Sequence, residues 1–544
     1  MKIKKILAVL TSIIISVSAT GCMSLKDFLY YGSSETDEES VGDSESEKSG
    51  TDGSTEESEK LAAIKSNVES LIEYAKKEDC EDKITELTET LLAQLDELAE
   101  EVAYVMVDYY SDFYNEDVEE KYDALYEDYY VAMDYLGYGF ANAYNAGNYD
   151  DLLEMYTNDD SIDYYTDKNL SLKRLESYAR SDYAAMDAAL DSYFDLAADE
   201  DMDDDEKNLA AAETYLEILG DYEAESFYDS FNRDFNGKDI IAMSDTLIEQ
   251  MTASEAEIED VIYSVPGVEK FLDSPMNFDE PIETLREYAG RISPEMGESA
   301  DKLYDEKLYR LMSGDDCYNG SFCIELPASE SAMIYVYCDE DFYSLTTAIH
   351  EFGHFHSSFY DDTPDYLCAN NIDIAEIQSQ GMEMLFMNYY DEIFGDQAEI
   401  MKVYKLYEMI DTTISACLIG QFEYDILSHR DDLTPEDVVK RFNTLMKQND
   451  YDVQLYEITH IFEQPGYYIS YCVSALAALD IWMNYLDDYD RAVEMYNKIS
   501  RIKSNSSEYQ FRSAISMCGF RDVMSDKFFG LLSERVSEYL TKYQ

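Results

Sequence analysis

His350-Glu351-Phe352-Gly353-His354 spells the pattern H-E-x-x-H inside a proline-free run, residues 345–355, that can form a helix. On a helix, side chains at positions i and i+4 lie about one turn apart on the same face, so both imidazoles can bind one Zn²⁺ ion. Glu351 then projects to the side, where it can take a proton from a metal-bound water. The alternative is a helix surface with two solvated histidines. The chain has only five histidines, three of them within residues 350–356, and this clustering favours the metal site.

The composition excludes several classes of protein. The chain has 544 residues with a formal net charge of −79, and 46% of them are hydrophobic. This apolar content is too high for a disordered chain and can build a large core. The negative charge argues against nucleic-acid binding, which needs a basic surface, and against docking on anionic lipid headgroups. The acidity is consistent with a solvated exterior or, alternatively, with steering of cationic peptides.

Residues 1–22 are predicted to be an export signal. Three lysines precede an apolar run, residues 6–17, that is too short to span a bilayer. The ending Ser18-Ala19-Thr20-Gly21-Cys22 resembles a bacterial lipobox, which implies cleavage before Cys22 and a lipid on its thiol. Ala19 departs from that pattern, so secretion without a lipid and an uncleaved anchor helix are alternatives. We expect an exported protein, attached only by this lipid to the outer face of the bacterial cytoplasmic membrane.

The next part of the chain changes from a polar tether to a helical region. Residues 23–59 are rich in Asp, Glu, Ser and Gly and cannot bury enough apolar surface to fold, so they predict an acidic tether. From residue 60 to about residue 313, apolar residues recur at helical spacing, as in Ile64, Val68 and Leu71. Acidic breaks at residues 158–160 and 199–205 predict loops.

A short β-prone region precedes the H-E-x-x-H stretch. Residues 321–326 and 332–337 are apolar and β-branched or aromatic, and Pro327 separates them, which predicts a small sheet. An edge strand beside a peptidase metal can pair with the backbone of a substrate. A sheet that only packs against the helix is an equal alternative. Helices are expected from there to the C-terminus. Eight cysteines follow Cys22 at scattered positions with no C-x-x-C pair, so no second metal or redox site is predicted from them; export permits disulfides, but the spacing assigns none.

Two histidines need a third protein ligand, which leaves one position open for water. Ser357 and Tyr360 occupy the places of glycine and histidine in the extended H-E-x-x-H-x-x-G-x-x-H pattern, so the ligand should be a carboxylate. Six acids are candidates: Asp361, Asp362, Asp365, Asp373, Glu376 and Glu383. Spacing favours Glu376, on a returning helix predicted over residues 372–386. Glu376 and Glu383 share a helix face, so one could bind the metal while the other orients a ligand.

Three motifs together resemble the oligoendopeptidase F and thimet oligopeptidase family of zinc metallopeptidases. They are residues 347–354 around H-E-x-x-H, residues 373–383 around Glu376, and the tyrosine-rich residues 467–471. The resemblance implies a mainly α, large bilobal helical metallopeptidase fold with a small β-sheet next to the metal-binding helix. It also implies that His350, His354 and Glu376 bind one Zn²⁺. On this basis residues 60–200 are an N-terminal helical region and residues 201–544 the catalytic region. A monomer that takes short peptides is expected.

His460 and the tyrosines after it are the candidates for stabilising the oxyanion. A Pro465-Gly466 break places them where a loop enters a helix. A tyrosine hydroxyl or an imidazole N–H there could donate a hydrogen bond to the oxyanion, and the family uses this region in that way. Tyr468 and Tyr471 are three residues apart and share a helix face, which favours them over Tyr467. Structural packing is the alternative for each tyrosine. His356 and His429 receive no predicted role.

These residues predict a zinc metalloendopeptidase that hydrolyses short unstructured oligopeptides at the cell surface. Glu351 would act as general base and then return the proton to the departing amine. The alternative is a lipid-anchored oligopeptide-binding protein without catalysis, which would not need an intact Glu351. A third hypothesis, an anchored helical interaction protein, requires no metal.

Overall fold

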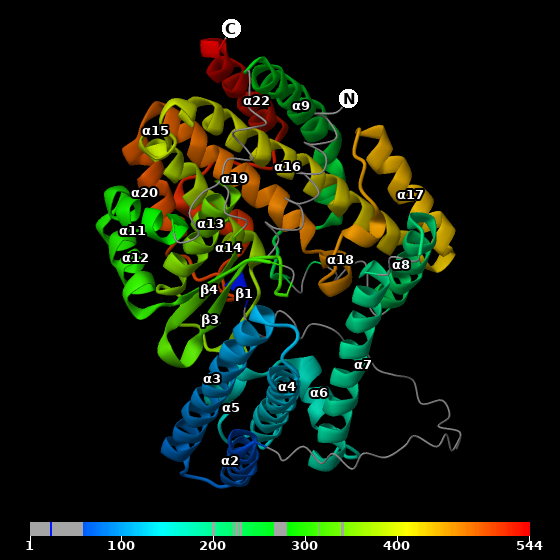
Figure 1. Ribbon diagram of the computed structural model, residues 1–544. Helices are drawn as coiled ribbons and strands as arrows, with labels where there is room; N and C mark the ends of the chain where they lie inside the picture. The colour runs from blue at the N-terminus through cyan, green and yellow to red at the C-terminus, as the bar shows by residue number, and fades with distance from the viewer. Residues whose placement is uncertain are drawn as a thin grey trace. The chain divides into compact units, whose positions relative to one another are not determined.

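Helices make up most of the chain, together with one small sheet (Figure 1). The computed structural model describes residues 22–23, 58–198, 202–220, 222, 228, 231–265, 280–314, 316–338 and 342–543. The predicted signal and tether therefore lie outside the described residues, except at 22–23 and 58–59. Two compact units are present. The N-terminal unit comprises Leu29–Tyr109 and Asn115–Ala189, and the C-terminal unit comprises Met1–Phe28, Tyr110–Tyr114 and Leu190–Gln544.

The N-terminal unit is built from amphipathic helices. They are α2 (Glu59–Ala75), α3 (Glu81–Ser111), α4 (Glu116–Tyr144), α5 (Asp150–Leu153), the 3₁₀ turn η2 (Glu154–Tyr156), α6 (Asp159–Tyr165) and α7 (Leu172–Ala198), with α3 and α7 running on past its boundary. The Ser58 hydroxyl caps α2 by accepting from the Leu61 N–H at 3.2 Å. Ile64, Val68 and Leu71 are fully buried, as their spacing predicts. Asn158 caps α6, so this helix begins within the predicted acidic loop.

The C-terminal unit contains the rest of the helices that the structure describes. They are α8 (Asp204–Leu219), α9 (Gly237–Ser264), α11 (Glu280–Ile292), α12 (Pro294–Glu306), α13 (Phe342–Ser358), α14 (Ile372–Phe386), α15 (Tyr390–Ile393), α16 (Ala398–His429), α17 (Pro435–Gln448), α18 (His460–Glu463), α19 (Tyr468–Asp487), α20 (Tyr489–Ile499), α21 (Phe511–Cys518) and α22 (Asp526–Leu540). Short 3₁₀ turns join them: η4 (Pro327–Ser329), η5 (Asp365–Leu367), η6 (Met387–Tyr389), η7 (Gly395–Gln397), η8 (Arg430–Asp432), η9 (Leu455–Glu457) and η10 (Thr541–Tyr543).

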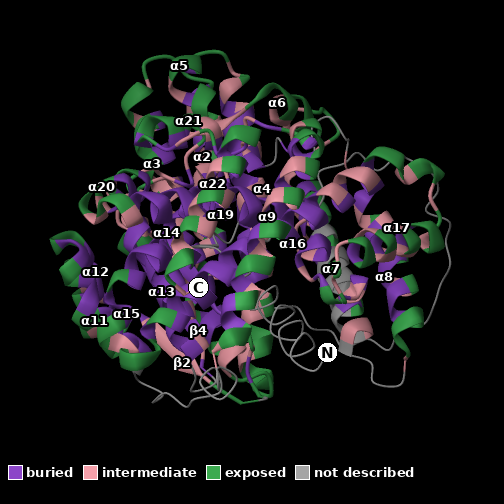
Figure 2. Ribbon diagram, turned by 90° about the horizontal axis from the view of Figure 1, so that it is seen from above, coloured by how far each residue is buried: buried purple, intermediate pink, exposed green. Residues whose placement is uncertain are grey.

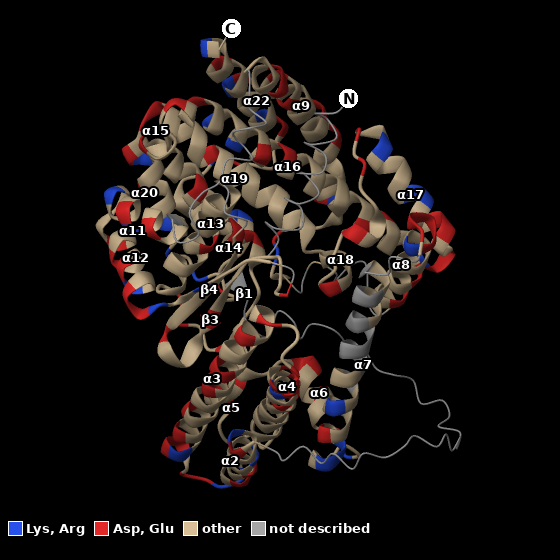
Figure 3. Cartoon of the chain, viewed as in Figure 1, with Lys and Arg blue, Asp and Glu red and all other residues tan. Residues whose placement is uncertain are grey.

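The core of the C-terminal unit lies where α14, α16 and α19 pack together, with α13 against α14 and α9 against α16. α13, α14, α16 and α19 are largely buried (Figure 2), whereas α9 buries only part of its surface. By length and composition α19 could cross a membrane, but 89% of its apolar stretch is buried inside the structure. This burial is accounted for by the place of α19 in the core of the C-terminal unit. Asp and Glu positions are spread along the helices and outnumber Lys and Arg (Figure 3), in keeping with the net charge.

The sheet has the strand order β1-β3-β4-β2. Its strands are β1 (Cys22–Met23), β2 (Tyr309–Met312), β3 (Phe322–Leu326) and β4 (Ser331–Tyr337). β3 and β4 form the predicted antiparallel pair, with Phe322 opposite Tyr335. β2 runs parallel to β4, although helical spacing predicts helix up to about residue 313; pairing with a distant strand overrides that local preference. α13 packs against β3 and β4, which confirms the predicted mainly α fold with a small sheet next to the H-E-x-x-H helix.

Candidate metal centre

His350 and His354 lie one turn apart on α13, the helix that packs on the sheet. Their ring centroids are 5.1 Å apart, and the rings are inclined at 75° to each other. Both side chains are almost fully buried, with 4% of His350 and 1% of His354 exposed. A buried imidazole needs a partner for each ring nitrogen, so the two histidines are not the solvated pair that the sequence left as an alternative.

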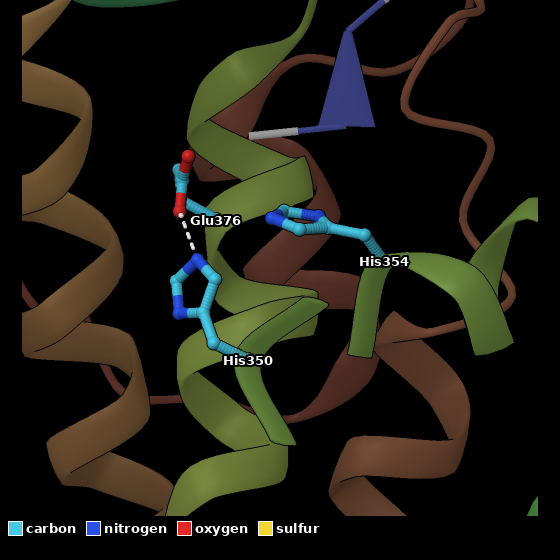
Figure 4. A group of neighbouring side chains, drawn as sticks. All are labelled: His350, His354 and Glu376. Carbon is cyan, nitrogen blue, oxygen red and sulfur yellow. Dashed lines mark ion pairs between the residues drawn. The ribbon is translucent and has the colours of Figure 1, made fainter. Parts of the chain in front are cut away.

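Glu376 comes from α14 and completes a group of three ligand-type side chains (Figure 4). One ligand atom from each of His350, His354 and Glu376 lies within 4.8 Å of the others, and Glu376 Oε2 is 3.5 Å from His350 Nε2. Gly353 allows this approach. A Cβ at that position would lie 2.5 Å from the Gln378 carbonyl oxygen and 2.6 Å from Ser379 Cα. The glycine between the histidines therefore lets α13 and α14 cross in direct backbone contact.

Several buried polar atoms of this group have no protein partner. Among the described residues, His350 Nε2 and both ring nitrogens of His354 make no hydrogen bond. An unsatisfied buried polar group costs roughly 1–3 kcal/mol. Two imidazole nitrogens and a carboxylate that converge in a buried site are a donor set for a divalent metal ion. The residues present thus fit a divalent metal ion.

A line of buried charges lies behind His350 and fixes its orientation. His350 Nδ1 is 2.8 Å from Glu383 Oε1, and Glu383 Oε2 accepts from Lys405 Nζ at 2.7 Å. Lys405 also pairs with Glu408 at 2.7 Å. Burial alone would raise the pKa of Glu383, but Lys405 and His350 outweigh burial and hold that pKa below its usual value. Glu383 is therefore ionised and accepts the Nδ1 proton, which turns the Nε2 lone pair toward Glu376 and His354.

Glu351 is buried beside the histidines, and one of its carboxylate oxygens has no donor among the described residues. Only 1% of it is exposed, and its Oε2 has no hydrogen-bond partner within the part of the chain that the structure describes. Burial raises the pKa of Glu351 well above the usual value, and the nearby carboxylates Glu376 and Glu383 add to this effect while His350 opposes it. A carboxyl group with a raised pKa is suited to accept a proton near neutral pH and to give it up again.

The tyrosine-rich segment borders the same carboxylate. The Tyr467 hydroxyl lies 3.1 Å from Glu376 Oε1, and the ring of Tyr467 is 4.9 Å from that of His460. Tyr471 also lies near Glu376, since burial and then charges including Glu376 raise its pKa. For Tyr468 the charged neighbours are instead Glu463 and Glu423. Spacing favours Tyr468 and Tyr471 over Tyr467, whereas the structure brings Tyr467 into contact with the site.

His460 is oriented by a carboxylate in the same helical turn. Its Nδ1 is 2.6 Å from Glu463 Oε2, and its ring lies 5.6 Å from that of Tyr468 and 6.4 Å from that of Tyr471. An imidazole with one nitrogen bound to a carboxylate presents a defined nitrogen on its opposite side. With Nδ1 donating to Glu463, the Nε2 of His460 can donate a hydrogen bond at the edge of the tyrosine cluster when the ring carries a second proton.

Arg233 joins the segment that carries Glu376 to the one that carries the tyrosines. It forms a fully buried ion pair with Asp373 at the start of α14, with N–O distances of 2.9–3.1 Å. It also donates to the Gly466 carbonyl at 2.8 Å and to the Ser470 hydroxyl at 2.6 Å. The Gly466 N–H donates to Glu423 at 2.7 Å. The Pro-Gly break is therefore held on both sides by the buried side chains of Arg233 and Glu423.

The structure also places the other residues considered from sequence. Asp361 accepts from the Asn505 N–H, Asp362 pairs with Lys503, and Asp373 pairs with Arg233. None of these three acids takes part in the group of His350, His354 and Glu376. His356 is a packing residue whose Nδ1 bonds the Ser299 hydroxyl and whose pKa burial lowers to about 4, while His429 lies at the surface.

Comparison with known proteins identifies the fold. No protein-family model and no curated protein sequence matches the chain. Among solved structures, a protein of Bacillus anthracis str. Ames provisionally named oligoendopeptidase F matches with a TM-score of 0.68 at 13% identity, over 90% of this chain and 98% of its own. PZ peptidase A matches with a TM-score of 0.64 at 14% identity over the same shares. The chain therefore has the fold of these large helical peptidases, with its His-His-Glu group on two crossing helices of that fold.

Proposed function

We propose that this protein is a zinc-dependent metalloendopeptidase that hydrolyses short, unstructured oligopeptides. The observation that carries the proposal is the convergence of His350, His354 and Glu376, with three imidazole nitrogens that have no hydrogen-bond partner among the described residues. Glu351 lies beside them, as peptide hydrolysis requires of a general base. The shared fold with proteins named as peptidases supports the same reaction class.

In this mechanism His350, His354 and Glu376 would hold the zinc ion. When bound, zinc supplies Lewis-acid chemistry: it polarises a carbonyl and lowers the pKa of water. Glu351 takes one proton from the attacking water and later delivers it to the nitrogen of the departing amine, so that the peptide bond is exchanged for a carboxyl group and an amine. Glu383 keeps the proton on His350 Nδ1 throughout.

The remaining polar groups act on the carbonyl oxygen of the substrate. Tyr467 and His460, with Tyr468 and Tyr471 as the candidates favoured by spacing, can donate hydrogen bonds to the negative charge that develops there. Arg233 and Glu423 position this segment, since they hold Gly466 just before the first tyrosine. The tyrosines after Gly466 are thereby held in fixed positions relative to Glu376.

The test combines metal analysis with a cleavage assay. We expect about one zinc per chain and cleavage of an internally quenched fluorescent peptide that stops on chelation and returns with zinc. Glu351→Gln should retain the zinc but lose activity by at least about a thousandfold, because the general base is gone. Near-normal cleavage by that variant would refute the mechanism. Stoichiometric peptide binding without any cleavage by the native protein would identify the oligopeptide-binding alternative instead.

We also propose export and attachment through a lipid on Cys22, on the strength of the sequence of residues 1–22. The acidic tether would then separate the enzyme from the membrane. Expression in a bacterial host should place the native chain in the membrane fraction, and Cys22→Ser should release it to the soluble fraction. Recovery of both forms in the soluble fraction would favour simple secretion.

A further inference from the structure

The core helices α16 and α19 meet in a fixed antiparallel register (Figure 1). Gly420 of α16 faces Ile469 of α19, since a Cβ on the glycine would lie 3.0 Å from Ile469 Cδ1 and 3.1 Å from Ile469 Cβ. Three residues after Gly420, Glu423 accepts a hydrogen bond at 2.7 Å from the N–H of Gly466, three residues before Ile469. A step of about one turn forward along α16 therefore corresponds to an equal step backward along the other segment.

The same register places Cys417 opposite Cys472. Cys417 comes three residues before Gly420, and Cys472 comes three residues after Ile469, so each lies on the contact face of its helix. The two thiols are hydrogen-bonded to each other, which holds the pKa of Cys417 below its ordinary value although burial opposes this. Burial raises the pKa of Cys472, and the same hydrogen bond adds to that effect. The two sulfur atoms are therefore in direct contact across the helix pair.

The surroundings of this pair allow the sulfur atoms to join. Both cysteines have 0% of their surface exposed, and both thiols are free in the structure. Cys417 also donates to the Ser244 hydroxyl of α9 at 3.6 Å. A thiol is a weak donor, so little is lost if that hydrogen bond is broken. A cross-link here would connect two helices that already pack together and would require no new contact between distant parts of the chain.

We propose that Cys417 and Cys472 form a disulfide that joins α16 to α19 when the chain folds in an oxidising compartment. The oxidant is a disulfide of another molecule, either a small one such as oxidised glutathione or that of a thiol oxidase. The Cys417 thiolate attacks it and releases one thiol, and the Cys472 thiolate then attacks the mixed disulfide and releases the second. The protein loses two S–H bonds and gains one S–S bond, while the oxidant takes up both electrons and both protons as two thiols.

Burial determines when this exchange takes place. Neither sulfur is accessible in the folded protein, so the oxidant must react before α16 and α19 close on each other. Disulfides form and persist outside the reducing cytoplasm, which agrees with the export proposed above. The cross-link also lies about two turns from the hydrogen bond between Glu423 and Gly466. It would therefore hold the start of α19, with its tyrosines, firmly against α16.

The proposal is tested by mapping the cysteines of the full-length protein. The chain is produced in a bacterial host with a reducing cytoplasm and in one with an oxidising cytoplasm, so that the second host supplies the oxidant during folding. Free thiols are blocked with iodoacetamide in denaturant without reduction, and the digested protein is analysed by mass spectrometry. We expect a linked pair of peptides with Cys417 and Cys472 from the oxidising host and two alkylated cysteines from the reducing host. Folded protein from the oxidising host with both cysteines alkylated, or with either joined mainly to another cysteine, would overturn the proposal.

Thermal unfolding of the same preparations provides a second readout. The disulfide closes a loop of about 55 residues, which should raise Tm by about 3–6 °C in protein from the oxidising host. Cys417→Ala and Cys472→Ala should each abolish this difference between the hosts. Cys518→Ala, which removes another buried cysteine of the C-terminal unit, should preserve it. A difference that persists in Cys417→Ala would contradict the assigned pair. Neither readout involves cleavage, so a failure of the proposed peptidase function would appear separately, in the fluorescent-peptide assay.

Discussion

The N-terminal unit and the metal centre use charge in opposite ways. In the N-terminal unit, apolar stripes such as Leu61, Ile64 and Val68 are buried, while ion pairs such as Lys77–Glu73 lie in solvent. At the metal centre the ion pairs are inside: Lys405 and Glu383 have side-chain exposures of 5% and 8%. Burying charged groups costs free energy, whereas packing apolar side chains in their place would not. The buried ion pairs of the metal centre therefore need a chemical reason. Holding a metal ligand and a proton donor in fixed positions is such a reason.

The largest effect is expected when the series of buried charged side chains behind His350 is interrupted. Lys405→Met removes the cation that pairs with both Glu383 and Glu408, two buried carboxylates. An uncompensated buried charge costs about 3–5 kcal/mol, so urea denaturation should show a loss of that order. Zinc affinity should fall about 10- to 100-fold, because Glu383 no longer orients His350 firmly. Lys77→Met, the matched change in the N-terminal unit, should leave both measurements unchanged. Equal effects of the two substitutions would remove the contrast between the two regions.

The next prediction concerns pH. Burial raises the pKa of Glu423 to about 8, although the Gly466 N–H and Arg233 oppose burial. The folded state then keeps a proton that the unfolded chain releases above its ordinary pKa near 4.5. Stability should therefore fall as pH rises from about 5 to about 8, by up to about 1.4 kcal/mol per pH unit. Glu423→Gln still accepts from Gly466 and removes this dependence.

Urea denaturation at pH 6 and pH 8 checks this prediction. The difference in unfolding free energy between variant and native protein should grow in favour of the variant by about 2 kcal/mol between the two pH values. His460 also affects the pKa of Glu423. Comparing the variant with the native protein at each pH separates the contribution of the Glu423 carboxyl group from that of the other titrating groups. A constant difference would mean that Glu423 is ionised throughout this range.

A smaller effect is expected at the place where α13 and α14 cross. Gly353→Ala places a methyl group within 2.6 Å of backbone atoms of α14 and must push the two helices apart. Overpacking of this kind costs about 1–3 kcal/mol, and zinc affinity should fall because Glu376 moves away from the histidines. Gly530→Ala in α22 is the control, since nothing lies within 4 Å of its new methyl group; a helical glycine-to-alanine change there should stabilise by roughly 0.5–1 kcal/mol. Calorimetry and a zinc-binding titration measure both.

Local patterns predict those parts of the site whose residues lie on one helix or on neighbouring helices. The four-residue spacing of His350 and His354 places them on one face, and the seven-residue spacing of Glu376 and Glu383 predicts one acid near the metal and one behind a ligand. In the structure Glu376 joins the histidines and Glu383 bonds His350 Nδ1. The stripe of Ile84, Leu87 and Leu91 on α3 likewise follows from helical periodicity and is buried.

Contacts between distant segments could not be predicted in this way. Arg233 lies 140 residues before its partner Asp373, and no pattern in its neighbourhood marks it as a buried cation. Lys405 belongs to a helix that is buried on most sides, so periodicity gives it no special position. β1 pairs with a strand about 300 residues away, and both β1 and β2 are too short for an alternating pattern to be recognised. These features depend on tertiary pairing, which one sequence does not reveal.

The smallest effect distinguishes the tyrosines, for which spacing and structure give different answers. Tyr467→Phe removes the hydroxyl that lies 3.1 Å from Glu376 and should lower kcat about tenfold, with KM and Tm nearly unchanged, because a phenylalanine ring fills the same space. Tyr468→Phe is the matched control and should lower kcat less than twofold, since its charged neighbours are Glu463 and Glu423, not Glu376. A larger loss for Tyr468 than for Tyr467 would instead support the assignment that helical spacing predicts. Steady-state kinetics on one quenched peptide, with each variant loaded to the same zinc content, separates the two results because only a donor near the carbonyl oxygen acts on kcat alone.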